Sequence, residues 1–400
     1  MSQLSYMEKL LDGVEVEWKE LWQVTIWDKK FNAVERDKQP RVIKYHYFLA
    51  KDLKSLAIEN GNVKLLTTNL SNLWTSEELA GEKVSEGEVI AIPWGGNPVV
   101  QYYKGKFLTT DNRIATSADT DLLNNKFLYY YLLSQIDLIS SFYRGSGIKH
   151  PSMYDVLHIS IPIPPIHIQT EIVRILDTFT ELTAELTAEL TAELTARQQQ
   201  YAYYREQLLT SFNDDETEIK TLKDIFIMKA GQHISASKIS ANKSTSHIYP
   251  CFGGNGIRGF VDEKSHDGSY LLIGRQGALC GNVHRMSGEF YATEHAVVVT
   301  AKDGINIDWA FHKLTLMNLN QYASKSAQPG LAVGKLAGLK VSVPSLDEQE
   351  RIAAILDKFE AITASLTEGL PREIELRQQQ YEYYRDLLLS FPKPEVVAHD

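Results

Sequence analysis

Gln169-Thr-Glu-Ile-Val-Arg-Ile-Leu-Asp-Thr-Phe179 returns 180 residues later as Gln349-Glu-Arg-Ile-Ala-Ala-Ile-Leu-Asp-Lys-Phe359. The same offset, without a gap, aligns Arg197-Gln-Gln-Gln-Tyr-Ala-Tyr-Tyr-Arg205 with Arg377-Gln-Gln-Gln-Tyr-Glu-Tyr-Tyr-Arg385. Self-similarity at a fixed offset indicates a duplicated architecture. The chain is therefore predicted to consist of two related halves, each a globular unit followed by a helix.

The repeat continues more weakly into the segments before these helices. Gly87-Glu-Val-Ile-Ala-Ile92 parallels Gly268-Ser-Tyr-Leu-Leu-Ile273, and Gly105-Lys-Phe107 parallels Gly288-Glu-Phe290. Aliphatic runs at 89–93, 271–273 and 296–300, between Gly, Asn and Asp, are typical of strands and turns. We expect each unit to be α+β. Tyr6-Met-Glu-Lys-Leu-Leu11 also echoes Tyr204-Arg-Glu-Gln-Leu-Leu209, with Trp18 and Leu21 near the equivalents of Ile219 and Leu222, so the halves could close into a pseudo-twofold ring.

Residues 166–212 carry an apolar stripe at three- and four-residue spacing, which predicts a helix. About 40 helical residues would span roughly 60 Å. Because the order is domain, helix, domain, helix, two helices related by a pseudo-twofold axis would pair antiparallel as a coiled coil. The predicted boundaries are an N-terminal arm and first domain at 1–165, a central spacer helix at 166–212, a second domain at 213–345, and a C-terminal spacer helix and tail at 346–400.

The central helix contains one tetrapeptide three times, at Thr183 to Leu186, Thr187 to Leu190 and Thr191 to Leu194. Its leucines need a partner surface, because most helix stability in proteins comes from packing an apolar face. The block is interpreted either as a helical linker or solubilising charged face, or as a spacer of quantised length, about 6 Å per tetrapeptide. Gly369 and Pro371 align with Glu189 and Thr191, and the proline predicts a kink or a restart of the second helix.

Composition narrows the class of protein. With 44% hydrophobic and 23% charged residues the chain is an ordinary globular protein, long enough for two or more domains. Two cysteines, Cys251 and Cys280, suggest neither a disulfide framework nor a zinc site, and a reducing cytoplasm is expected. The net charge of -10 argues against a general nucleic-acid binder, but residues 28–54 are locally basic.

Catalytic motifs appear only as near-misses. Asn97-Pro98-Val99-Val100 lacks the second proline and the aromatic residue of an adenine methyltransferase loop. Gly330-Leu-Ala-Val-Gly334-Lys335-Leu336 is one residue short of a P-loop and has Leu in place of the hydroxyl residue. Asp214 with Glu218-Ile-Lys220 matches a nuclease triad in composition only. No catalytic residue and no metal site are predicted.

Together, the tetrapeptide block, the doubled Arg-Gln-Gln-Gln-Tyr motif and Gly369-Leu-Pro-Arg-Glu-Ile-Glu-Leu-Arg377 resemble the specificity subunits of type I restriction-modification enzymes, in the group with repeated Thr-Ala-Glu-Leu. The resemblance covers the whole chain in organisation and is strongest at 166–212 and 347–394. It implies two target recognition domains, each reading half of a split double-stranded DNA site. The target is then expected to contain about seven unspecified base pairs, since variants in this family differ in tetrapeptide number and spacer length together.

The resemblance also implies partners. Two methylation subunits would embrace the helices and bring S-adenosylmethionine, and two restriction subunits would use ATP and Mg²⁺; no cofactor is expected in this chain. DNA enclosed jointly with the methylation subunits would accommodate the acidic net charge. The alternative from another class is a helical scaffold or adaptor without sequence-specific DNA binding.

Base readout needs polar side chains at base edges. The internal repeat places Trp94, Asn97 and Asn112 in strand-end or loop regions that correspond to those of Arg275, Gln276 and His295, and Lys149 and Arg258 are further candidates. The alternative for any one of these is a solvated loop residue. Lys29, Lys30 and Lys44 are better suited to phosphates, which orient without specifying. Candidate methylation-subunit contacts, for which packing between helix ends is an equal alternative, are Tyr201, Tyr204, Arg205, Tyr381, Tyr384 and Arg385.

Overall fold

The computed structural model describes residues 6–11, 13–211, 217–277, 279–325, 329–364 and 369–392. The chain divides into two compact units: Met1–Thr187 with Leu376–Asp400, and Ala188–Glu375. Helix α8 (Ile166–Thr210) contributes its first part to the first unit and its second part to the second. Among the described residues, no helix is long and apolar enough to cross a membrane.

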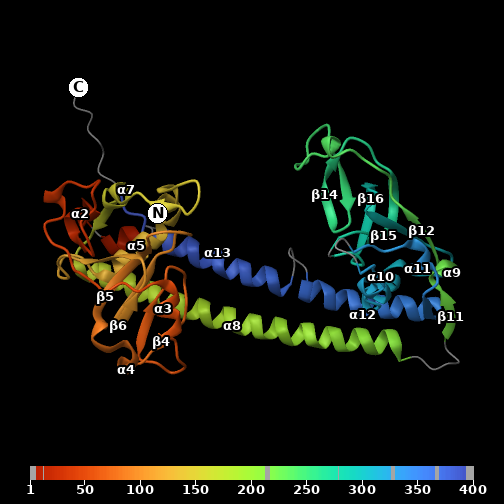
Figure 1. Ribbon diagram of the computed structural model, residues 1–400, viewed down its shortest axis with the longest axis horizontal. Helices are drawn as coiled ribbons and strands as arrows, with labels where there is room; N and C mark the ends of the chain where they lie inside the picture. Colours follow the sequence, from red (N-terminus) through yellow and green to blue (C-terminus); the bar gives the residue numbers. More distant parts are fainter. Residues whose placement is uncertain are drawn as a thin grey trace. The chain divides into compact units, whose positions relative to one another are not determined.

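The first unit is built on a six-stranded sheet in the order β2-β7-β5-β6-β3-β4, with a separate pair β1-β10. Figure 1 labels β4, β5 and β6 of this sheet. All neighbours in the large sheet are antiparallel except β3 and β6. The elements before α8 are α1 (Tyr6–Leu11), β1 (Glu17–Glu20), α2 (Leu21–Val24), β2 (Thr25–Trp27), η1 (Arg36–Lys38), α3 (Ala50–Ser55), β3 (Val63–Leu66), β4 (Trp74–Thr75), α4 (Glu77–Ala80), η2 (Gly81–Lys83), β5 (Ser85–Pro93), β6 (Gln101–Thr109), β7 (Asn112–Ser117), α5 (Asn125–Ser134), α6 (Ile136–Ser141), β8 (Tyr143–Arg144), β9 (His150–Pro151), α7 (Met153–Leu157) and β10 (Ser160–Ile163).

The second unit repeats this plan, with a sheet in the order β12-β17-β15-β16-β13-β14 and a pair β11-β18. Its one parallel pairing in the large sheet, β13 with β16, matches β3 with β6. The elements after α8 are β11 (Thr217–Thr221), α9 (Leu222–Ile225), β12 (Phe226–Ala230), η4 (Ala236–Lys238), β13 (Tyr249–Gly253), β14 (Gly256–Val261), β15 (His266–Gly274), β16 (Val283–Ala292), β17 (Ala296–Ala301), α10 (Ile307–Leu316), η5 (Leu319–Tyr322), α11 (Val333–Ala337), β18 (Lys340–Pro344), α12 (Leu346–Ala364) and α13 (Leu370–Leu388), whose later part belongs to the first unit.

The internal duplication predicted from the sequence is therefore confirmed in the order and pairing of the strands. The predicted strand runs lie within β5, β15 and β17. Trp18 pairs with Pro162 as Ile219 pairs with Ser342, so the faint N-terminal correspondence is also present. Trp18 Nε1 donates to the carbonyl of Pro392 (3.0 Å), which holds β1 against the segment that follows α13 within the first unit.

Each sheet body is held to its helix by a buried glutamine at the same place in the repeat. Gln169 is fully buried, and its Oε1 accepts from the N–H of Asn124 while its Nε2 donates to the carbonyls of Leu122 and Pro164. Gln349 makes the equivalent three bonds, to Asn306, Gly304 and Pro344. Buried polar groups require such partners. The glutamine that opens each copy of the helix motif thus fixes the helix on its own sheet body.

A second contact follows two turns later, and here the two units differ in the partner side chains. Asp177 of α8 accepts from Tyr130 Oη (2.7 Å) and Lys126 Nζ (2.8 Å) of α5. In the second unit His312 Nε2 lies 2.8 Å from Asp357 Oδ1 of α12, and Asp357 is paired with Arg285 of β16. The scaffold is shared, while the partner side chains are particular to each unit.

Helices pack in antiparallel pairs inside each unit. In the first unit, Phe179 and Thr180 of α8 contact Tyr384 and Tyr381 of α13. In the second, Tyr201 and Tyr204 of α8 stack on Phe359 of α12. The predicted central helix of 166–212 is observed as 166–210, and residue 212 lies outside the described residues.

The predicted second helix is two helices, because α12 ends at Ala364 and α13 begins at Leu370 (Figure 1). Gly369 has φ +108°, and a Cβ at this position would lie 2.5 Å from the carbonyl oxygen of Ala361, so only glycine fits. Pro371 is the second residue of α13, where a missing N–H costs nothing. The restart predicted from the proline is confirmed.

The leucines of the tetrapeptide block remain partly exposed: Leu186 is 42% exposed, and Leu190 and Leu194 have intermediate burial. Residues 365–368, which correspond to 185–188 of the tetrapeptide block at the 180-residue offset, lie outside the described part of the chain.

Candidate functional site

Polar and aromatic side chains gather where β5 of the first unit ends. Trp94 lies between two of them: the Arg113 guanidinium is 4.5 Å from its ring centroid, and the His150 ring centroid is 5.3 Å away. The N–H of Gly96 donates to the carbonyl of Lys149 (3.1 Å), which ties the loop after β5 to the loop before β9. Asn97 and Lys149 are exposed. Three of the predicted DNA contacts, Trp94, Asn97 and Lys149, thus belong to two loops that meet.

A buried ion pair between Arg113 and Asp28 supports the Trp94 ring. Arg113 and Asp28 have side chains 3% and 0% exposed, with Nη1 and Oδ2 3.4 Å apart. Tyr47 Oη donates to the same oxygen (2.7 Å), and the N–H of Ile114 donates to Asp28 Oδ1 (2.9 Å). Burial and this bond raise the pKa of the Tyr47 phenol well above its usual range, so it stays a donor. The sequence reading missed this network, because Asp28 and Arg113 are 85 residues apart.

Asn112 has to be removed from the candidate base contacts. It is fully buried, and its Nδ2 donates to the carbonyl of Leu66 (3.0 Å). A side chain without exposed surface cannot reach a base edge. The sheet register shows the cause, since Trp94 N–H donates to Asp111 as Arg275 N–H donates to His295. The residue that corresponds to His295 is therefore Asp111, which is exposed, and not Asn112. A shift of one residue in the alignment of a strand exchanges its buried face for its exposed face.

The candidates of the second unit lie together at the equivalent end of its sheet. His295 Nδ1 is 2.6 Å from Gln276 Oε1, and Arg275 Nη1 donates to the carbonyl of Glu294 (3.3 Å). A hollow of about 400 Å³ adjoins them, lined by Gly253–Gly254, Asn255–Ile257, Arg258 and His295. A Cβ on Gly254 would lie 2.7 Å from the carbonyl oxygen of Gln276, so the glycine permits the close approach of the two loops.

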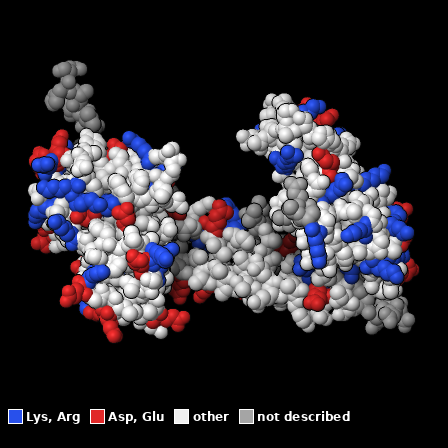
Figure 2. All heavy atoms as spheres, viewed as in Figure 1, with Lys and Arg blue, Asp and Glu red and all other residues white. Residues whose placement is uncertain are grey.

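The three lysines predicted to hold phosphates, Lys29, Lys30 and Lys44, are all exposed. Lys29 Nζ lies 5.7 Å from the ring centroid of Tyr47, above the buried Asp28 network. Figure 2 shows Lys and Arg gathered on the first unit around the place of α2. A locally basic surface on an acidic chain, expected from the sequence, is present on this unit.

The six helix residues predicted as partner contacts mainly pack within their own units. Tyr201 Oη is 3.2 Å from His312 Nδ1, Tyr381 Oη is 3.1 Å from Thr180 Oγ1, and Arg385 is only 8% exposed. Arg205 has intermediate burial with its guanidinium over Tyr201, while Tyr204 and Tyr384 each keep 40% exposure. The most exposed tyrosines of the motif are its neighbours Tyr203 and Tyr383, at 60% and 63%, which the sequence reading did not single out.

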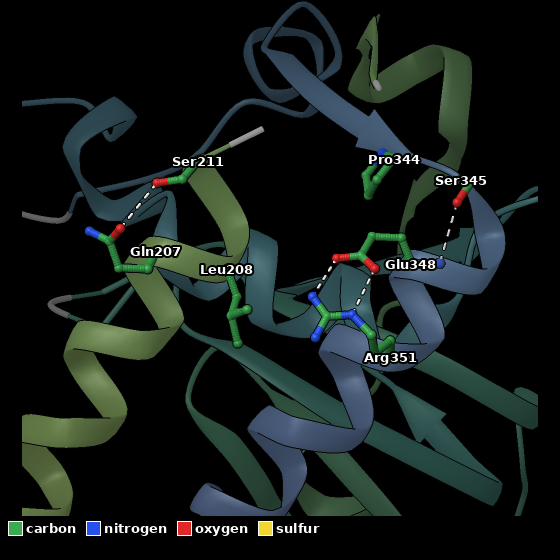
Figure 3. Close-up of a pocket in the computed structure, with 7 residues that line it drawn as sticks. All are labelled: Gln207, Leu208, Ser211, Pro344, Ser345, Glu348 and Arg351. Atoms are coloured by element: carbon green, nitrogen blue, oxygen red, sulfur yellow. Dashed lines mark hydrogen bonds and ion pairs between the residues drawn. The ribbon is translucent and has the colours of Figure 1, made fainter. Parts of the chain in front are cut away.

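A hollow of about 560 Å³ lies between the end of α8 and the start of α12 (Figure 3). Its acid is already neutralised, because Arg351 Nε and Nη2 both donate to Glu348 at 2.7 Å. This pairing holds the pKa of the Glu348 carboxyl below its usual range. Gln207 and Ser211 bond to each other on the other wall. Among the described residues of the lining, none is an activated nucleophile or base.

Three ligand-type side chains, His312, Asp357 and Glu360, lie close enough together to resemble a metal site. They surround the guanidinium of Arg285, whose Nη2 contacts His312 Nε2 (2.9 Å), Glu360 (3.1 Å) and Asp357. The arginine supplies the positive charge that a metal would bring. Burial lowers the pKa of His312 to about 4, so the imidazole is neutral at pH 7. The cluster joins α12 to the sheet body.

Comparisons with known proteins agree with this duplicated architecture. The family model described as type I restriction modification DNA specificity domain matches residues 44–196 and again residues 214–376. The type I restriction enzyme EcoprrI specificity subunit of Escherichia coli is 49% identical over 92% of this chain and 93% of its own length. The EcoR124I/EcoR124II specificity subunit of the same species is 35% identical, with all of both chains covered.

Solved structures share the fold at low sequence identity. The S subunit of a type I restriction-modification system from M. genitalium has a TM-score of 0.53 at 17% identity, over 98% of both chains. A chain from a structure of the type I R-M system, described in terms of complex assembly and conformational transition, has a TM-score of 0.61 at 15% identity, over 94% of this chain and 98% of its own. With two matched domains and relatives of this identity and coverage, the chain belongs to the type I restriction-modification specificity family, as a specificity subunit with two recognition domains.

Proposed function

We propose that each unit of this chain reads one half of a bipartite double-stranded DNA target through the loops at the end of its central strand. The observation that carries the proposal is a common scaffold with different polar side chains at one place. The six strands have the same order in both sheets. At the corresponding end, the sheet of the first unit carries Trp94, Asn97 and Lys149, whereas the sheet of the second unit carries Arg275, Gln276 and His295. Sequence readers need to vary at the reading edge while the architecture stays fixed.

Lys29, Lys30 and Lys44 are proposed to hold phosphates, because exposed lysines act as mobile point charges that position a duplex without reading it. Arg258 is proposed as a further contact, since it is exposed and lines the hollow beside His295.

The chain is proposed to be non-catalytic and to act with two methylation subunits and two restriction subunits. S-adenosylmethionine, ATP and Mg²⁺ would then belong to the partners. Tyr203 and Tyr383 support a partner that binds twice, because the same residue of the repeated motif is left more than half exposed in both units. The proposed membership of the group with Thr-Ala-Glu-Leu repeats rests on the tetrapeptide block in α8.

The test is methyl transfer from S-adenosylmethionine to DNA by the purified chain alone, by methylation subunits alone, and by the two mixed. We expect methylation only in the mixture, at a two-part sequence. Methyl transfer, ATP hydrolysis or DNA cleavage by the rigorously purified chain alone would contradict a non-catalytic role. A scaffold without DNA recognition is disfavoured by the two specificity domains, and it predicts a mixture whose methylation shows no dependence on this chain.

A further inference from the structure

The loops that meet at the reading end can be matched residue by residue between the two units. Gly96 N–H donates to the Lys149 carbonyl in the first unit, and Gly277 N–H donates to the Pro329 carbonyl (2.9 Å) in the second. The neighbouring positions, 95 and 150 in the first unit, therefore correspond to 276 and 330 in the second. These positions hold Gly95 with His150, and Gln276 with Gly330. Each unit thus places one side chain and one glycine there, on opposite loops.

His150 is exposed, yet its ring is held in place. Its Nδ1 lies 2.6 Å from the carbonyl oxygen of Trp94, and its ring is tilted by 37° against the indole, with the ring centroids 5.3 Å apart. Trp94 is in turn backed by the buried Arg113. A Cβ at position 95 would lie 3.2 Å from His150 Cε1, so the glycine leaves room for the ring. An exposed side chain that is already ordered loses little entropy when it binds.

The bond to Trp94 also fixes the tautomer of a neutral His150 imidazole. A carbonyl oxygen only accepts, so Nδ1 must carry the proton. A neutral imidazole then presents Nε2 as a lone-pair acceptor. In the major groove an acceptor selects bases with an exocyclic amino group, which are adenine through N6 and cytosine through N4.

Gln276 presents the opposite polarity at the corresponding place. Its Oε1 is engaged by His295 Nδ1 (2.6 Å), and its NH₂ group remains a donor. Gly330, facing it across a β-bridge, adds no side chain. A donor selects base acceptors such as guanine N7 and O6.

We propose that His150 and Gln276 are equivalent specificity-determining residues, His150 accepting from the amino group of one adenine or cytosine in the first half-site, and Gln276 donating to a base acceptor in the second. The proposal rests on the proposed function, because it assigns individual base contacts to units that read DNA. It adds His150, and it gives the two half-sites opposite hydrogen-bonding chemistry at one shared position.

The experiment uses the full chain assembled with methylation subunits, after its target has been mapped by methylation sequencing. In the first half-site each adenine is replaced singly by purine and each cytosine by 2-pyrimidinone, which removes the amino group. Dissociation constants are measured for the wild type, His150→Ala and His150→Phe. The phenylalanine keeps a ring on Trp94 without a nitrogen, and His167→Ala, an exposed histidine of the same unit, is the matched control.

We expect one replaced base to weaken wild-type binding about tenfold, the size of a good base contact. Both His150 variants should weaken binding to the natural site by a similar factor and lose sensitivity to that one replacement. Gln276→Ala should relax only the second half-site. If no replacement loses its effect in the His150 variants, or if these variants alter the second half-site, the assignment is overturned. A wild-type complex without a two-part target would instead overturn the proposed function.

Discussion

Gln349 joins α12 to the sheet body of the second unit through three hydrogen bonds, and its removal should destabilise that unit. Gln349→Ala leaves one N–H, of Asn306, and two carbonyls, of Gly304 and Pro344, without this partner in a site only 1% exposed. An unsatisfied buried group costs about 1–3 kcal/mol, and water entering the vacated space offsets part of the cost. We expect a loss of about 2–4 kcal/mol in the free energy of unfolding.

For a unit of this size, that loss corresponds to a fall of about 5–15 °C in the midpoint of thermal unfolding. Differential scanning calorimetry and urea unfolding of the full chain would measure it. Gln169→Ala, which breaks the same three bonds in the first unit, should show a loss of similar size. Gln199→Ala, at an exposed position of α8, is the control and should change the free energy by less than about 0.5 kcal/mol. A Gln349→Ala variant as stable as this control would refute the reasoning that the buried amide holds the helix to the sheet.

Three further outcomes are expected. Deleting Thr187 to Leu190 removes about 6 Å of helix, and we expect the spacer of about seven base pairs to shorten by about one pair, as mapped by methylation sequencing, with both half-sites unchanged. Exchanging Asp214 to Val343 for the same region of a relative should change one half of the target only. His312 has a folded pKa of about 4, below the unfolded value of about 6.5, so the unfolded state takes up this proton first. The stability of the second unit should therefore fall further between pH 6.5 and pH 4 in the wild type than in His312→Gln, measured by urea unfolding across that range.

An unchanged spacer in the deletion variant would argue against a length gauge, and altered half-site bases would show that the helix does more than set distance. A domain exchange that changed both half-sites would count against independent reading by the two units. Parallel pH profiles for the wild type and His312→Gln would mean that the buried imidazole does not titrate as its surroundings imply.

The duplicated fold was predictable because the repeat keeps the residues that join helix to sheet. Gln169 and Gln349 are identical across the 180-residue offset and make the same three bonds in their own units. Asp177 and Asp357 are also identical, and they contact α5 and α10 through different partner side chains. Because these side chains have buried partners, both copies of the helix motif keep them. The break between α12 and α13 was also readable, since Gly369 and Pro371 act through local backbone geometry.

The proposed reading surface was only partly predictable, because loops carry no periodic signal. Strand-end residues such as Trp94 and Gln276 could be found from the offset between the two halves of the repeat. This offset is 181 residues between β5 and β15 but 184 residues between β7 and β17. Asn112 was aligned with the wrong residue for that reason. His150 reaches the site through a loop 56 residues from Trp94, a separation that no local pattern encodes. The partner contacts assigned to the helix tyrosines stay a prediction, since helical spacing does not say which face meets the other helix.

The role of this chain in choosing the DNA sequence is tested most directly by sequencing methylated bases in cells that carry the partner subunits, with and without this chain. We predict that a single bipartite motif, with two defined halves separated by about seven unspecified pairs, is methylated only when the chain is present. Methylation of the same sites without the chain, or a continuous motif in its presence, would contradict the assignment.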